Sequence, residues 1–466
     1  MTYAATANVS SLTLGKLLKT LSKGAVYNQL SSASEAWDYV KKVTDGDATG
    51  REYHYEVMTS YGPAAVQATG FSATSKFPIG QRSVVAEATA QYKDFDMTIE
   101  YDLTLENKSG SELVAYAKPL AHEVNAKTIV AGRLASAWLF GEGSGAIGVN
   151  STVTISTADT VTCILSTTSA NAGRSHSGWF ELNDKLKCYS TAGVLHNTIT
   201  TGGGDIVADY YLVTSVNQDT DTVILAPYTS ADVLLNVSSA TPPALAPAAG
   251  DVWYRYQTTA NDLTAISTND YNTLSEVMVG LESLAADDGR IVNGLTMSGA
   301  TAGNRFDCSG AVIAGSHFNS LMLKGMRRTG GQTDGKKITV SKAWMHDRTL
   351  GVALEQAAAN RQFFNTQDVN TGIGSTGHKF KKMFIDFESC EFVPLARVWI
   401  LPDQKGPLEF AGRDYSDVDV GGQGVFLKGS STGQYYKQGQ KFLSGAGVLA
   451  ARHPAAINVL TNFVLA

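Results

Sequence analysis

A long segment from Gly50 to Tyr92 most constrains what this chain can fold into. It has the character of extended backbone, with Gly62, Gly70 and Gly80 spaced along it. It holds too few large apolar residues to bury a core of its own. A long connection without its own core is usually a functional loop or lies on another surface. We therefore expect this segment to depend on a surface outside itself.

The composition is that of a globular, core-forming chain. Its 466 residues are 43% hydrophobic and 17% charged, and this length permits two to four domains. With 45 Gly but only 11 Pro, the chain is neither collagen-like nor linker-rich. A formal net charge of -6 argues against bulk electrostatic coating of nucleic acid. Few charges and many small residues suit a protein that partners largely cover.

The four cysteines are scattered and form no CxxC pair, so the sequence encodes neither a zinc knuckle nor a dense disulfide framework. They are Cys163, Cys188, Cys308 and Cys390. A reducing cytoplasm during synthesis is the simpler interpretation, and whether Cys163 and Cys188 ever pair is left open. The N-terminus lacks a signal-peptide pattern, and no apolar stretch reaches the ~18 residues of a membrane span. We expect a soluble protein.

The chain on either side of the extended segment has regular patterns. Residues 1–48 carry two short helical patterns joined by Gly and Ser, which is typical of an extended arm. Apolar residues alternate with polar ones from Phe95 to Leu105, the period-2 pattern of a half-buried strand. From Ser111 to Phe140 apolar residues recur at helical spacing. This predicts a long spine-like helix, kinked in its first turns by Pro119.

The composition changes sharply at residues 141–148. Thr, Ser, Val, Asp and Gly then dominate to about Tyr256, with short alternating strands and regular turns, which predicts an all-β module inserted into a larger α+β domain. Beyond it the patterns predict three helices and two or three strands. The expected helices are Tyr271–Ala286, Cys308–Gly325 and Arg348–Phe364, and the expected strands are Lys336–Trp344 and one or two within Phe380–Leu401.

Two catalytic motifs match in letters but not in context. Residues 372–377 fit GxGxxG, yet a helix precedes them and a strand follows, the reverse of a dinucleotide site. Residues 429–433 fit GxSxG with Ser431 and a later His453, but no acid follows Ser431 and the stretch is typical of a hairpin turn. The histidines lack metal-ligand spacing, and no P-loop occurs. We expect no catalytic, cofactor or metal site.

A group of basic residues begins at the end of the expected helix Cys308–Gly325 and continues beyond it. It consists of Lys324, Arg327, Arg328, Lys336, Lys337 and Lys342. Such a group can contact phosphates. The favoured alternative is a solvated loop or an intersubunit ion-pair surface, because aromatic residues are not interleaved as single-strand binding requires.

The order of these elements resembles the major capsid protein of tailed bacteriophages, with the Hong Kong-97-type or Johnson fold. Residues 1–48 resemble its N-terminal arm, 49–93 its E-loop, 94–140 its P-domain strand and spine helix, and 257–466 the rest of its P-domain and its A-domain. Residues 141–256 resemble the β-barrel insertions of some members. Two stretches near the C-terminus support the resemblance most. FIDFESCEFVPLARVWILPDQ resembles the family's strand pair that ends in "lp", and GQKFLSGAGVLAARHPAAINVLTNF resembles its terminal strand and the "npaa" motif that follows.

The resemblance implies a non-catalytic subunit that self-assembles into hexamers and pentamers of an icosahedral virion shell, built in the host cytoplasm. It implies a portal and a separate scaffolding protein, since the arm is too short to contain a scaffold, and leaves a cementing protein open. It implies only weak contact with packaged double-stranded DNA and none with a membrane. The family's Lys–Asn crosslink is not carried over to Lys76, because no partner can be assigned.

The extended segment Gly50–Tyr92 also contains candidate interface anchors. Its apolar and aromatic residues would lie across other copies, since aromatic side chains are enriched at interface cores. These residues are Tyr53, Tyr55, Phe71, Phe77 and Ile79. The alternative is that they cover their own subunit. Two other functions stay open: another phage or surface assembly protein, such as a tail tube or receptor-binding component, and a serine hydrolase using Ser431 and His453.

Overall fold

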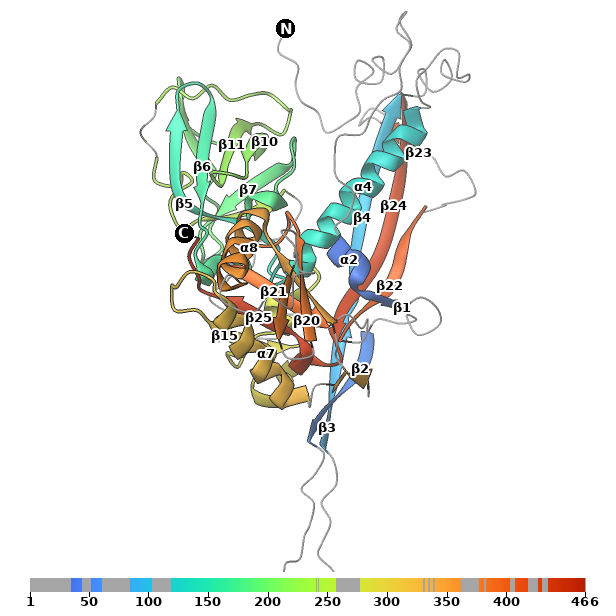
Figure 1. Ribbon diagram of the computed structural model, residues 1–466. Helices are drawn as coiled ribbons and strands as arrows, with labels where there is room; N and C mark the ends of the chain where they lie inside the picture. The colour runs from blue at the N-terminus through green and yellow to red at the C-terminus, as the bar shows by residue number, and fades with distance from the viewer. Residues whose placement is uncertain are drawn as a thin grey trace, which may run out of the picture.

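The computed structural model has a mixed α and β architecture in which three bodies meet, and a narrow hairpin projects from them (Figure 1). The bodies are a closed barrel, a six-stranded sheet with two helices, and a long narrow sheet crossed by one helix. The structure describes residues 35–43, 52–60, 84–102, 119–239, 241, 243–256, 277–329, 332–333, 336–337, 340–361, 377–380, 383–402, 407–417, 426–429 and 435–465.

The long sheet carries the helix α4 (Pro119–Phe140) along its length (Figure 1). Strand β4 (Lys93–Asp102) pairs antiparallel with β24 (Tyr435–Ala451) over its whole length. The remaining members are β1 (Lys41–Val43), β22 (Leu408–Asp417) and β23 (Phe426–Gly429), and the short helix α2 (Glu35–Tyr39) precedes β1. Of the predicted Ser111–Phe140 helix, the described part is Pro119–Phe140, and residues 111–118, on which the kink expected at Pro119 depends, lie outside the described residues.

The barrel closes in the order β10-β11-β6-β5-β12-β7, within the part of the chain expected to be all-β. Large side chains fill its interior, among them Tyr211 and Trp253, both 0% exposed. Cys163 and Cys188 are free thiols inside it, and burial raises the pKa of each. The strands are β5 (Ala146–Ser156), β6 (Thr160–Leu165), β7 (Lys185–Tyr189), β10 (Tyr210–Asn217), β11 (Thr222–Tyr228) and β12 (Val252–Arg255), with an extra hairpin of β8 (Thr198–Thr201) and β9 (Gly204–Val207).

The third body is a mixed six-stranded sheet in the order β15-β25-β21-β18-β20-β19. Helices α7 (Gly315–Thr329) and α8 (Asp347–Arg361) accompany it. Its strands are β15 (Asn304–Asp307), β18 (Val340–Met345), β19 (Gly377–Phe380), β20 (Met383–Ser389), β21 (Arg397–Pro402) and β25 (Asn458–Thr461). Smaller elements are α6 (Leu281–Leu284), β13 (Ile291–Val292), β14 (Leu295–Thr296), β16 (Gln332–Thr333) and β17 (Lys336–Lys337).

Two helix predictions are wrong in extent. The helix expected from Cys308 begins at Gly315, because residues 304–307 pair in parallel with β25 and the chain then turns with positive φ at Ser309 and Gly310. Of the helix expected over Tyr271–Ala286, the described part contains only the four residues of α6. Here tertiary pairing and close packing override a helical pattern.

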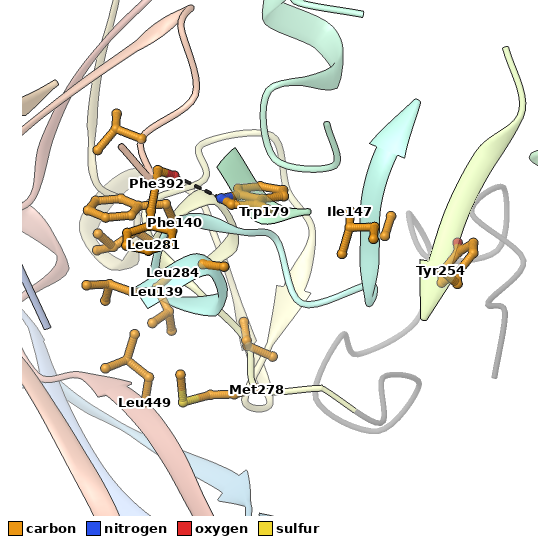
Figure 2. Packing of buried hydrophobic residues seen from close by; sticks show 14 of the residues in the cluster. Leu139, Phe140, Ile147, Trp179, Tyr254, Met278, Leu281, Leu284, Phe392 and Leu449 are labelled. Atoms are coloured by element: carbon orange, nitrogen blue, oxygen red, sulfur yellow. Dashed lines mark hydrogen bonds between the residues drawn. The ribbon is translucent and has the colours of Figure 1, made fainter. Parts of the chain in front are cut away.

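The three bodies share one apolar core (Figure 2). Leu139 and Phe140, at the end of α4, are fully buried beside Leu281 and Leu449. From the barrel side, Trp179 donates its indole Nε1–H to the carbonyl of Phe392 at 2.9 Å. Each such large side chain contributes about 1.5–3 kcal/mol when fully buried. The barrel therefore packs directly against the other two bodies and is not joined to them by a linker alone.

Candidate functional site at the projecting hairpin

The hairpin consists of β2 (Glu52–Ser60) and β3 (Val84–Gln91), paired antiparallel from Glu52 opposite Gln91 to Ser60 opposite Val84. Figure 1 shows it extending beyond the rest of the described molecule. Its side chains alternate as a half-buried strand requires. In β2 the inward-facing Tyr53, Tyr55 and Val57 are buried, and the residues between them are exposed.

The far end of the hairpin presents apolar surface to solvent. Val84 is 56% exposed and Val85 45% exposed, whereas Ala88 and Ala90, nearer the body, are fully buried. The chain that joins the two strands, residues 61–83, lies outside the described residues. Exposed apolar side chains on a projecting element are candidates for contact with another molecule.

The base of the hairpin is fixed by buried hydrogen bonds. The hydroxyl of Tyr53 donates to Glu409 at 3.1 Å, and the side-chain amide of Asn293 donates to the Tyr55 oxygen at 3.0 Å. The backbone N–H of Thr89 donates to the carbonyl of Asn293 at 2.9 Å. Asn293 and Gly294 have φ of 53° and 77°, the geometry of a tight two-residue turn between β13 and β14. These contacts fix the angle at which the hairpin leaves the body.

The outer face of the hairpin is acidic. Glu52, Glu56 and Glu87 are exposed, and His54 Nδ1 lies 3.2 Å from a Glu87 carboxylate oxygen. Glu56 and Glu87 stand directly opposite each other across the strands. Like charges in that position are destabilising. This face would therefore gain stability from a cationic surface laid against it.

The structure separates the five expected interface anchors into two groups. Tyr53 is 5% and Tyr55 4% exposed, so in the subunit both rings cover their own chain, which is the alternative set out for them. A side chain with so little free surface cannot also anchor a partner in this conformation. Phe71, Phe77 and Ile79 lie outside the described residues. Val84 and Val85 were not anticipated, because the sequence does not reveal how far along a strand the rest of the molecule covers it.

The basic residues do not form one free patch. The Arg328 guanidinium donates to the backbone carbonyls of Gly303 and Ala302 at 2.9 and 2.7 Å, and also to that of Gly299. Lys342 pairs with Glu388 at 2.9 Å. The Lys324 ammonium donates to the carbonyl of Arg305 at 3.1 Å. Lys324, Arg328 and Lys342 therefore all bind groups of their own subunit. Arg327 is exposed at the end of α7, and Lys336 and Lys337 form β17.

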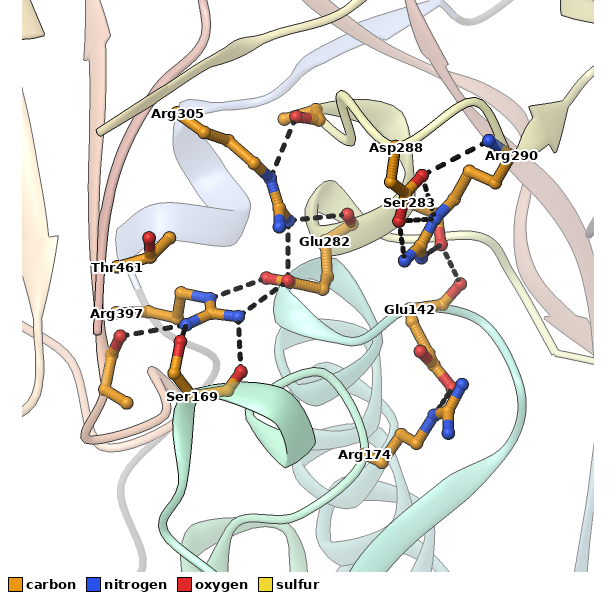
Figure 3. A network of polar contacts seen from close by, with 12 residues as sticks. Glu142, Ser169, Arg174, Glu282, Ser283, Asp288, Arg290, Arg305, Arg397 and Thr461 are labelled. Carbon is orange, nitrogen blue, oxygen red and sulfur yellow. Dashed lines mark hydrogen bonds and ion pairs between the residues drawn. The ribbon is translucent and has the colours of Figure 1, made fainter. Parts of the chain in front are cut away.

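A buried charged network joins the barrel to the body (Figure 3). Glu282 of α6 accepts hydrogen bonds from both Arg397, at 2.9 Å, and Arg305, at 2.6 Å. Arg397 also donates to the hydroxyl and carbonyl of Ser169, on the barrel side, at 2.8 Å each. Burial acts to raise the pKa of Glu282, but Arg397 and Arg305 outweigh it and lower that pKa to about 2. The carboxylate is thus charged and holds Arg397, which in turn binds Ser169 on the barrel side.

Most residues of the two catalytic motifs lie outside the described part of the chain. Ser431 lies outside the described residues, as do residues 372–376, and His453 immediately precedes a short 3-10 helix, Pro454–Ala456. Among the described residues, no group of three or more His, Cys, Asp and Glu side chains is placed to hold a metal ion. None of the described helices is both long and apolar enough to cross a membrane.

No family model matches the chain, and no curated protein matches it significantly. It is similar to solved structures over nearly its whole length. The capsid asymmetric unit of cyanophage A-1(L) has a TM-score of 0.48 and 9% identity, with 97% of this chain and 99% of that chain covered. The capsid of an empty GTA particle gives 0.45 and 9%, covering 99% and 100%. The capsid of Myoviridae phage XM1 gives 0.41 and 7%, covering 95% and 96%.

Proposed function

We propose that this chain is the major capsid protein of a tailed double-stranded DNA phage, a non-catalytic subunit that self-assembles into the icosahedral head shell. In this proposal the hairpin β2–β3 and the residues between its strands are the E-loop, and α4 is the spine helix. The long sheet belongs to the P-domain. The six-stranded sheet with α7 and α8 belongs to the remainder of the P-domain and the A-domain, and the barrel is an inserted domain.

The observation that carries the proposal is the combination of a rigid base and an uncovered end in one hairpin. Hydrogen bonds of Tyr53, Tyr55 and Thr89 hold the base at a fixed angle. Val84 and Val85 are left in solvent beyond the body. A preorganised arm loses little conformational entropy when it binds, so it is suited to lie on a neighbouring copy. Repetition of one such contact between copies generates a closed assembly when the rotation between successive copies closes.

The acidic outer face adds specificity to this contact. Glu52, Glu56 and Glu87 would favour a basic surface on the neighbour and disfavour another hairpin, because like charges repel. In the proposal the neighbouring hexamer and pentamer subunits form the shell in the host cytoplasm, with a separate scaffolding protein and a portal as partners. Packaged DNA would meet the shell by weak contact only. No described feature favours a tube, a spike or a hydrolase.

The test uses two matched valines that are exposed to the same degree. Val84 in the hairpin is 56% exposed, and Val207 on the barrel is 53% exposed, so V84D and V207D should both leave subunit stability nearly unchanged. Electron microscopy and sedimentation of the purified full chain should show shells or capsomer rings for the wild type and V207D, and unassembled subunits for V84D. Normal shells from V84D would overturn the role of the hairpin. Tubes, trimeric spikes, or a small particle with esterase activity from the wild type would overturn the function.

A further inference from the structure

Glu409 joins three segments that are far apart in the sequence. Its side chain, in β22, is only 2% exposed. Lys41 of β1 binds one carboxylate oxygen at 2.5 Å, and Arg452, just after β24, binds the other at 2.5 Å. The Tyr53 hydroxyl, at the base of the hairpin, donates to that second oxygen at 3.1 Å. Arg452 Nη2 also contacts the Tyr53 oxygen at 3.1 Å, so four residues form one cluster.

The cluster lies where the N-terminal part of the chain meets the sheet. Strand β1 has three residues and pairs in parallel with β22, with Lys41 directly opposite Glu409. Just before it, Val40 is buried, and the Trp37 ring packs on Phe410 with centroids 5.0 Å apart. Apolar packing therefore holds the preceding turn, while the Lys41 ion pair determines where β1 lies on the sheet. So short a strand gains little from its backbone hydrogen bonds alone.

We propose that Glu409 is a positioning residue that couples β1 to the base of the hairpin, so that loosening one loosens the other. A carboxylate this deeply buried depends on its cationic partners, because an unpaired charge in the interior is strongly destabilising. When Lys41 is removed, Glu409 is held only by Arg452 and Tyr53, and the hydrogen bond of Tyr53 must readjust. Lys41 and Tyr53 bind different oxygens, so the coupling passes through Glu409 itself.

The consequence for assembly rests on the proposed function. If the hairpin lies on a neighbouring copy, the state of the N-terminal segment of one subunit sets the angle at which its hairpin is offered. The Glu409 carboxylate would thereby link the position of the N-terminal segment to the contact between the hairpin and a neighbouring copy. The coupling itself is a property of the single chain and is tested there.

Hydrogen exchange of the full-length chain, in unassembled subunits separated by sedimentation, measures the coupling. The reporter is the peptide 84–91, which contains the Thr89 amide bonded to Asn293, whereas the ion-pair partner of Lys41 is Glu409. We expect Lys41→Met to accelerate its exchange about two- to fivefold, because the Lys41 side chain is 48% exposed and solvent weakens its ion pair. The control is Lys187→Met, since the Lys187 ammonium lies over the Tyr256 ring on the barrel. It should leave the peptide unchanged.

A double-mutant cycle then identifies Glu409 as the link. Tyr53→Phe removes only the hydroxyl, and if Glu409 couples the two residues the fold-changes of K41M and Y53F will not multiply in the double variant. The inference is overturned if K41M accelerates exchange of residues 41–43 but not of 84–91, or if the two effects multiply. Both variants keep Glu409, so the test stands even where Glu409→Gln fails to fold. Failure here leaves the shell function intact, whereas a wild-type chain that assembles into tubes or spikes overturns the function and leaves the coupling.

Discussion

The charge on Glu282 makes a defined contribution to stability that depends on pH. Its pKa falls from an ordinary 4.5 to about 2 in the folded chain, because the Arg397 and Arg305 guanidinium groups outweigh the effect of burial. The gap between these values corresponds to about 3 kcal/mol of folding free energy at neutral pH. Because the folded pKa is the lower one, this stabilisation is complete above pH 4.5 and disappears as the pH falls through 2. About 2 of the 3 kcal/mol are lost by pH 3.

Glu282→Gln removes this charge while keeping nearly the same shape. Urea unfolding at pH 7, followed by tryptophan fluorescence, should show the variant less stable than the wild type by about 3 kcal/mol. At pH 3 the difference should shrink to about 1 kcal/mol, because the wild type has lost most of the contribution. The matched control is Asp288→Asn. The Asp288 side chain is 48% exposed and pairs with Arg290, so its loss should change stability by less than about 1 kcal/mol.

The comparison between the two pH values decides the matter. An E282Q deficit of the same size at pH 3 as at pH 7 would refute the reasoning, because it would arise from shape or hydrogen-bond number rather than from charge. An Asp288→Asn deficit as large as that of E282Q would refute it in another way. Burial would then not be what distinguishes the two carboxylates.

Two further predictions concern packing and the basic residues. Gly447→Ala should destabilise the chain by about 1–3 kcal/mol in thermal unfolding, since a Cβ there would lie 2.2 Å from Cζ of Phe410; an unchanged melting temperature would mean that the ring moves freely. Arg328→Met should lower the melting temperature, because three backbone carbonyls lose their donor. It should not change the salt-dependent binding of double-stranded DNA. The control Arg327→Met should leave the melting temperature unaltered. Weaker DNA binding by R328M at an unchanged melting temperature would instead place Arg328 on a phosphate-binding surface.

Local patterns in the sequence predicted elements well where a single pattern was long. The period-2 alternation from Phe95 corresponds to β4, and the alanine-rich pattern from Arg348 corresponds to α8, which runs Asp347–Arg361. The turn expected around residues 429–433 lies between β23 and β24. The helical pattern from Cys308 misled because β15 and the turn after it depend on the distant strand β25. The pairing partner of a short strand is not written in its own residues.

The turn between β13 and β14, which contacts the base of the β2–β3 hairpin, has a signal in the sequence. Asn293-Gly294 between apolar residues is a strong sign of a two-residue hairpin turn, since both positions need positive φ. It would have located β13 and β14. It would not have revealed that Asn293 holds Tyr55, because that contact spans 238 residues of chain.

The sequence by itself determined the extended pattern of β4 and the helical pattern of α8, and it indicated that residues 50–92 cannot bury a core alone. It did so because backbone preference and hydrophobic periodicity are local properties. Only the tertiary structure decided which charges are shared. Glu409 meets Lys41 across 368 residues and Glu282 meets Arg397 across 115, and in each case the carboxylate is buried, so it depends on its partner. Exposure is likewise a property of the whole fold: Val84 and Ala88 lie on one strand, yet the body covers only Ala88.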